Sequence, residues 1–181
     1  MNESFNINLD YLTEEERGML SKYIESYSIV SEREEKQNSF LSFVKHVWPT
    51  FIEGKHHRIY ADKLEKVANG EIKRLIINMP PRHTKSEFAS FLFPSWLMGK
   101  DSSRKIIQAT HTAELAVGFG RKVKNLIDSD VYRDVFPDVK LAIDAKASGR
   151  WSTSKGGEYY AVGVGGALAG RGADLCIIDD P

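Results

Sequence analysis

The pattern of apolar and polar positions divides the chain into a helical first part and a second part in which strands and helices alternate. Thr13 precedes Glu16, and Ser31 precedes Glu34, by the spacing of a capping box, in which two side chains bond free backbone N–H groups at a helix start. Two helices are therefore predicted. The second has apolar residues spaced i, i+3, i+4 and i+7, before a proline that should end it. These residues are Phe40, Phe43, Val44, Val47 and Pro49.

A third helix is predicted over about residues 56–68, before the Asn69-Gly70 turn. The pattern then changes to short apolar runs. Leu75-Ile76-Ile77 is typical of a strand buried on both faces, and Pro80-Pro81 ends it. A helix is predicted next, from about Lys85 to Trp96.

Strands and helices continue to alternate after this helix. Ile106 and Ile107 predict a second strand, residues 151–164 a hairpin or meander, and residues 173–178 another buried strand. The helix predicted after the second strand has apolar residues at about every fourth position, namely Leu115, Phe119, Val123 and Leu126. This alternation predicts an α/β domain with a mainly parallel sheet.

Charge and hydropathy exclude some classes of partner. The 25 basic residues balance 25 acidic residues, so any DNA contact depends on local patches. Arg121, Lys122 and Lys124 are one such group, although a solvated helix face is the simpler interpretation. The sequence has no run of about 20 apolar residues and does not begin like a signal peptide, so we expect a cytosolic protein without a membrane partner. The single cysteine, Cys176, lies in an apolar run, which predicts a buried thiol.

The segment from Met79 to Ser86 has features of a phosphate-binding loop. Such a loop needs backbone N–H groups at a helix N-terminus, a lysine that reaches the β and γ phosphates, and a hydroxyl for Mg²⁺. Lys85 and Ser86 supply the last two. Met79 and Thr84 stand where the usual pattern has glycines, so a Pro-Pro turn before a helix with a solvated lysine is the alternative.

A second motif is the apolar strand that ends in Asp179 and Asp180. This is the form of a Walker B motif, in which Asp179 would hold Mg²⁺ through water and Asp180 would orient or deprotonate the attacking water. Two carboxylates that merely cap a loop are the alternative. The two motifs occur in the order that a P-loop NTPase requires, which would place both at the carboxyl edge of one sheet. The combination favours nucleotide binding.

The string from Leu75 to Glu87 resembles the Walker A segment of the large terminase subunits of tailed phages, which often read PPRHGKS. The similarity extends from about Phe43 to the last residue. It includes residues 109–116 after the second strand, residues 135–137 in a short loop, and residues 163–181 before and within the Walker B motif.

The resemblance implies a P-loop NTPase fold of the RecA-like, additional-strand kind. It implies a helical N-terminal segment over residues 1–48 and an ATPase domain over residues 49–181, incomplete at its C-terminus. The implied reaction is Mg²⁺-dependent ATP hydrolysis that drives double-stranded DNA into a procapsid. The implied partners are the portal protein, the small terminase subunit and further copies in a pentameric ring. The implied location is the host cytoplasm, and nuclease activity is expected only of a further C-terminal domain.

The resemblance also implies roles for single residues. We expect three catalytic residues: Asp180, Arg82 and Arg171. Arg82 would sense the γ-phosphate. Arg171 would be an arginine finger that acts in its own subunit or on a neighbour in a ring. A loop arginine or DNA contact is the alternative for Arg171. Mg²⁺ is expected at Ser86 and Asp179. The nucleotide is expected to contact Pro81, Arg82, His83, Thr84, Lys85 and Ser86.

Some positions depart from the family pattern. Many members have glycine at the position of Thr84 and glutamate at that of Asp180. Residues 56–58 lie where the family usually recognises adenine, but the expected glutamine is missing, and an exposed helix start is the favoured interpretation. His83 and His111 are candidates to line the nucleotide pocket. Two other functions remain open: a RecA-like P-loop helicase, and a non-catalytic assembly or DNA-binding module.

Overall fold

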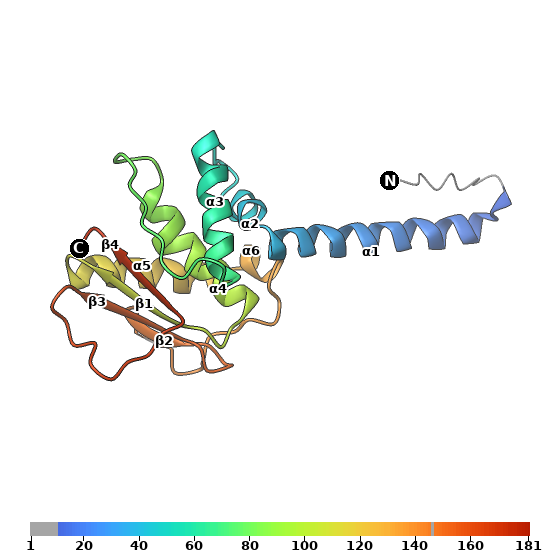
Figure 1. The fold of residues 1–181 in the computed structure, drawn as a ribbon. Helices are drawn as coiled ribbons and strands as arrows, with labels where there is room; N and C mark the ends of the chain where they lie inside the picture. The colour runs from blue at the N-terminus through green and yellow to red at the C-terminus, as the bar shows by residue number, and fades with distance from the viewer. Residues whose placement is uncertain (1–10, 146) are drawn as a thin grey trace.

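The computed structural model describes residues 11–145 and 147–181. Its second half combines helices with a four-stranded sheet: β1 lies between α4 and α5 in the chain, and the other three strands follow α6 without a helix between them (Figure 1). Among the described residues, no helix is long and apolar enough to cross a membrane. The helical elements are α1 (Glu14–Asn38), α2 (Phe40–Val47), α3 (Lys55–Ala68), the π-helical η2 (Glu87–Leu92), α4 (Phe93–Lys100), α5 (Ala113–Ile127) and α6 (Asp130–Arg133). The strands are β1 (Lys105–Thr110), β2 (Arg150–Ser152), β3 (Glu158–Gly163) and β4 (Leu175–Asp179).

The first helix begins where the sequence predicts and ends later. Thr13 and Glu16 form the capping box at the start of α1, so that prediction is confirmed. The predicted helix start at Ser31 is wrong, because α1 continues to Asn38. The break comes at Ser39, whose hydroxyl accepts a bond from the Ser42 N–H and so caps α2. The spacing of Ser31 and Glu34 occurs within one continuous helix, where both side chains remain on the surface.

Helix α1 extends away from the rest of the molecule (Figure 1). None of its residues is buried. Its last turns are fixed to the body, where Arg33 donates to the carbonyl of Asp134, Gln37 donates to that of Val135, and the Trp96 indole donates to the carbonyl of Lys36. Most of its length therefore adds little buried apolar surface to the folded state.

Helix α2 belongs to the main hydrophobic core. Phe40, Phe43 and Val44 are fully buried, as the predicted spacing requires. The ring of Phe40 meets Phe88 edge to face, with 5.5 Å between ring centroids, and also packs on Trp96. Because these partners lie beyond residue 49, α2 shares one core with the second half of the chain. The domain boundary at residues 48–49 stays a prediction.

The four strands form a mixed sheet in the order β2-β3-β1-β4. Strand β1 pairs in parallel with both β3 and β4, and β2 pairs antiparallel with β3 to complete a hairpin. Ile106, Tyr159 and Ile177 pack into the main core on one face, whereas Ile107 and Val162 belong to a small cluster on the other face. The α/β class, the second predicted strand, the hairpin and the last strand are confirmed.

The predicted first strand is wrong. Residues 75–77 have no regular secondary structure and pair with none of the four strands of the sheet. Leu75 and Ile77 pack against the core and Ile76 is 87% exposed, so the run alternates instead of being buried on both faces.

In α5 the buried face includes Ala116, Phe119 and Val123, and Leu115, the first residue of the predicted apolar series, is 46% exposed. The predicted burial of Cys176 is wrong. Cys176 is exposed, because successive residues of β4 point to opposite faces of the sheet and its neighbours Leu175 and Ile177 take the face that packs on the main core.

The predicted helix after the loop is confirmed but runs on to Lys100. Its first part, η2, is π-helical, and the N–H of Phe93 bonds to the carbonyl of Phe88. Pro94 follows directly and has no N–H to give to the preceding turn, which fits a local change of hydrogen-bond pattern there.

Candidate functional site

The loop over residues 79–86 bends through two left-handed residues. Arg82 has φ of 65° and Thr84 has φ of 63°. Positive φ is uncommon for any residue other than glycine, and it is strained for a β-branched residue such as Thr84. The loop therefore takes up a conformation that glycine would reach without strain, and surrounding contacts must hold it there.

The turn leaves amide groups at the start of a helix without partners. The Phe88 N–H bonds to the carbonyl of Thr84, which marks the first helical turn. Within residues 11–145 and 147–181, no backbone or side-chain acceptor is found for the amides of Thr84, Lys85 and Ser86. Three amides at a helix N-terminus form a region of positive potential that suits a phosphate.

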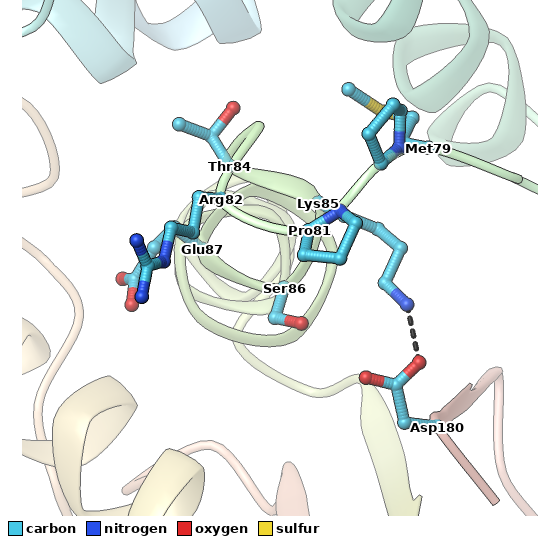
Figure 2. Close-up of a pocket in the computed structure, with 9 residues that line it drawn as sticks. Met79, Pro81, Arg82, Thr84, Lys85, Ser86, Glu87 and Asp180 are labelled. Atoms are coloured by element: carbon cyan, nitrogen blue, oxygen red, sulfur yellow. Dashed lines mark hydrogen bonds and ion pairs between the residues drawn. The ribbon is translucent and has the colours of Figure 1, made fainter.

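Lys85 joins this loop to the end of β4. Its ammonium contacts the carboxylate of Asp180 and lies 3.6 Å from that of Asp179 (Figure 2). The bond to Asp180 raises the pKa of Lys85, and the nearby charge of Asp179 acts in the same direction. The lysine of one predicted motif and the two carboxylates of the other are thus brought together.

A cavity of about 440 Å³ lies at this junction. In Figure 2 the side chain of Ser86 points to the same side as Asp180, whereas the guanidinium of Arg82 points to the side away from Asp180. His83 does not line the cavity, and its ring bonds to the carbonyl of Pro81 at 2.9 Å. The lining residues are Met79, Pro80, Pro81, Arg82, Thr84, Lys85, Ser86, Glu87 and Asp180.

Asp179 is held by a buried network that the sequence analysis missed. Its carboxylate accepts a hydrogen bond from the Ser90 hydroxyl at 2.8 Å, and that hydroxyl accepts one from the Gln108 amide at 3.2 Å. Ser90 and Gln108 are fully buried, and Asp179 is 6% exposed. A polar residue in the middle of the apolar strand β1 was the signal that could have identified Gln108, because a buried amide needs a partner.

Helix α3 contacts the loop through two side chains. The Tyr60 hydroxyl donates to the carbonyl of Lys85 at 3.0 Å, and burial raises its pKa, with a further contribution from the charge of Asp179. His57 contacts the Thr84 hydroxyl at 2.8 Å. The expectation of an exposed helix start is wrong for His57, which is 5% exposed, and correct for His56 and Arg58. His57 turns into the core because it packs on Phe51 and Phe88.

Arg171 lies at a different place from Lys85. It stacks over Tyr160, 4.0 Å from the ring centroid, beside a second cavity of about 230 Å³. That cavity includes Lys105 and Glu158, the first residues of β1 and β3, whereas Asp179 is the last residue of β4. Within one chain, Arg171 is therefore at the opposite end of the parallel strands from the predicted phosphate site. Its role toward a neighbouring subunit stays a prediction.

Other candidates have local contacts. The N–H of His111 donates to the carbonyl of Asp180 at 3.1 Å, so its backbone, at least, borders the site. Lys122 forms an ion pair with Glu87 at 2.7 Å and lies over the rings of Phe91 and Phe119, on the helix face next to the loop. Arg121 is exposed on the same helix, as a solvated helix face predicts.

The oxygen atoms near Lys85 suit a hard cation. Ser86 offers a hydroxyl and Asp179 and Asp180 offer carboxylates, which are ligand types that Mg²⁺ accepts together with water and substrate phosphates. The described part of the chain has no cluster of three or more acidic, histidine or cysteine side chains able to hold a metal by themselves. Two carboxylates and a hydroxyl fit a cation that a bound phosphate helps to hold.

Comparisons of the chain with protein-family models, with curated proteins and with solved structures found no match.

Proposed function

We propose that this chain binds and hydrolyses Mg-ATP at the junction of the loop 79–86 and the end of β4. The observation that supports this most is the contact of the Lys85 ammonium with Asp180 and its approach to Asp179. Two segments that are 93 residues or more apart in the sequence meet with the charges that a phosphate and a divalent cation require.

The loop would bind the phosphates. The amides of residues 84–86 would donate to phosphate oxygens, and Lys85 would leave Asp180 to neutralise the charge on the β and γ phosphates. The ammonium needs no pKa shift to carry its charge there, because an ordinary lysine is protonated at neutral pH. The loop needs no glycine for this role, because Arg82 and Thr84 already adopt left-handed conformations.

The two adjacent carboxylates would have different roles, one in metal binding and one in proton transfer. Buried Asp179, oriented by Ser90, would hold Mg²⁺ together with Ser86, and this ion would supply charge neutralisation for the developing phosphate charge. Asp180 has a largely exposed side chain, so it can reach a water molecule and accept its proton. The different environments of the two adjacent carboxylates support the assignment of a structural role to one and a catalytic role to the other.

At the level of the whole protein, we propose the large terminase subunit of a tailed phage, with a P-loop NTPase fold of the RecA-like kind. This proposal rests on the resemblance of residues 75–87 and 163–181 to that family. Double-stranded DNA, the portal protein, the small terminase subunit and a pentameric ring are partners proposed on the same basis. The fold with a central parallel β1 and the loop beside β4 is compatible with it.

Calorimetric titration with Mg-ATP, followed by single-turnover hydrolysis, tests the site. The unaltered chain should bind Mg-ATP, and Lys85→Ala should not. Asp180→Asn should bind but hydrolyse about 10² times more slowly, the lower part of the range for loss of a general base. Lys63→Ala is the matched control, because Lys63 pairs with Asp62 on the surface of α3. If Lys85→Ala and Lys63→Ala bind equally well, the site is misplaced. If neither the unaltered chain nor any variant binds Mg-ATP, a non-catalytic module is favoured.

A further inference from the structure

His57 is buried with both ring nitrogens engaged. The Gly54 N–H donates to Nδ1 at 2.8 Å, so this nitrogen carries no proton. Nε2 lies 2.8 Å from the hydroxyl of Thr84. That hydroxyl donates its own proton to the carbonyl of His83 at 2.6 Å, so it must accept the bond from His57. The network is consistent only with a neutral imidazole protonated at Nε2.

Thr84 is the point at which the loop becomes helix. It has φ of 63°, and its carbonyl accepts the first helical hydrogen bond, from Phe88. Lys85 follows directly and points to Asp180 (Figure 2). A change in the Thr84 backbone would therefore redirect both the lysine and the three unpartnered amides.

We propose that His57 is a positioning residue of the phosphate loop, whose Nε2–H bond to the Thr84 hydroxyl holds Thr84 in its left-handed conformation and so keeps Lys85 and the loop amides in place. This inference rests on the proposed function. A threonine at this φ needs an external restraint that a glycine would not need. His57 supplies it from a fixed position, because its ring packs on Phe51 and Phe88 with centroids 4.7 and 5.3 Å away.

His57 also has a purely structural contact, the bond from Gly54, which caps the start of α3. The test must separate this cap from the effect on Thr84. His57→Phe keeps the packing of the ring and removes both hydrogen bonds. His57→Gln retains an amide that is able to donate to Thr84. Thr84→Gly removes both the hydroxyl and the steric need for a restraint.

Mg-ATP affinity is measured for His57→Phe in the Thr84 and in the Thr84→Gly backgrounds, with melting temperature as the measure of folding. With Thr84 present, His57→Phe should weaken binding roughly five- to tenfold, the effect of one lost hydrogen bond, and His57→Gln should recover part of it. With Thr84→Gly, the same change should alter binding less than about twofold. A melting temperature lowered equally in both backgrounds is the expected effect of the lost cap.

An equal loss of affinity in both backgrounds, or no loss in either, would overturn the inference. Lys85→Ala separates this result from failure of the proposed function: if Lys85→Ala also leaves binding unchanged, it is the nucleotide site that has failed. Nitrogen NMR of the His57 ring gives a test without nucleotide. The proton should be on Nε2 alone at neutral pH, and a ring protonated on Nδ1 would contradict the proposed contact.

Discussion

Replacement of Ser90 by alanine should destabilise the protein more than any other single hydroxyl deletion near the site. The Ser90 hydroxyl donates to the carboxylate of Asp179 at 2.8 Å and accepts from the amide of Gln108 at 3.2 Å. All three side chains are buried. Ser90→Ala therefore leaves a charged acceptor and a neutral donor without this partner, in a place with little access to water.

The magnitude follows from the types of bond. A hydrogen bond to a charged group contributes about 1.5–3 kcal/mol, and a neutral one about 1 kcal/mol. The Lys85 ammonium, 3.6 Å from Asp179, offsets part of the loss by retaining some of the charge interaction. We expect the free energy of unfolding of Ser90→Ala to fall by about 3 kcal/mol. Urea unfolding with an unchanged m-value would measure it as a pure stability effect.

Ser95→Ala is the matched control. Ser95 is equally buried, but its hydroxyl donates to the carbonyl of Phe91 in the preceding turn, at 2.7 Å. Its removal breaks a local contact and leaves no charged group unpaired, so we expect a loss of less than about 1 kcal/mol. The reasoning is refuted if the two variants lose stability to within about 0.5 kcal/mol of each other.

Three further predictions concern other parts of the chain. Alanine at both Tyr23 and Tyr27 should change the free energy of unfolding by less than about 0.5 kcal/mol, because both side chains are exposed on α1 and no residue of α1 is buried; a loss above about 2 kcal/mol in urea would contradict this. Cys176 should react with a thiol reagent in the folded protein, but more slowly than in urea, since burial raises the pKa of its thiol; protection until unfolding would contradict its exposure. Burial, and then the charges of His56 and His83, lower the pKa of His57 against the opposing effect of Glu53. The stability that the neutral His57 ring contributes is therefore fully present above the ordinary histidine pKa of about 6.5. It is lost as pH falls from there toward the lowered pKa of the folded protein, by at most about 1.4 kcal/mol per pH unit. The difference in unfolding free energy between the natural protein and His57→Phe should decrease over that interval, and a constant difference would contradict the buried neutral ring.

The elements that sequence analysis predicted correctly have strong local signals. Helix α2 has four apolar residues at helical spacing, and α1 has a complete capping box at Thr13. The predictions that were wrong depended on tertiary contacts. Residues 75–77 have the composition of a buried strand, but only the arrangement of β1, β3 and β4 decides which segments join the sheet. Cys176 lies in an apolar run of which only the alternate residues, Leu175 and Ile177, face the main core.

The candidate site was predictable only where local sequence motifs indicate it. The order of the two motifs predicted that both would lie at the carboxyl edge of one sheet. Asp179 does end β4, but the loop that contains Lys85 follows no strand of the sheet, and the contact between Lys85 and the two carboxylates depends on the tertiary fold. Ser90 and His57 were not predictable, because their partners are 89 and 27 residues away in sequence and no local pattern indicates them. The left-handed Thr84 was not predictable either, because a β-branched residue rarely adopts positive φ without contacts that hold it there.

The most direct test of the central claim is amide hydrogen exchange of residues 84–86, measured by NMR with and without Mg-ATP. These amides have no acceptor among the described residues, so they should exchange rapidly in the free protein. The account predicts that Mg-ATP slows their exchange, and that Lys85→Ala abolishes this protection while Lys63→Ala retains it. Unchanged exchange at residues 84–86 under conditions where nucleotide is bound would contradict the assignment of this loop as the phosphate site.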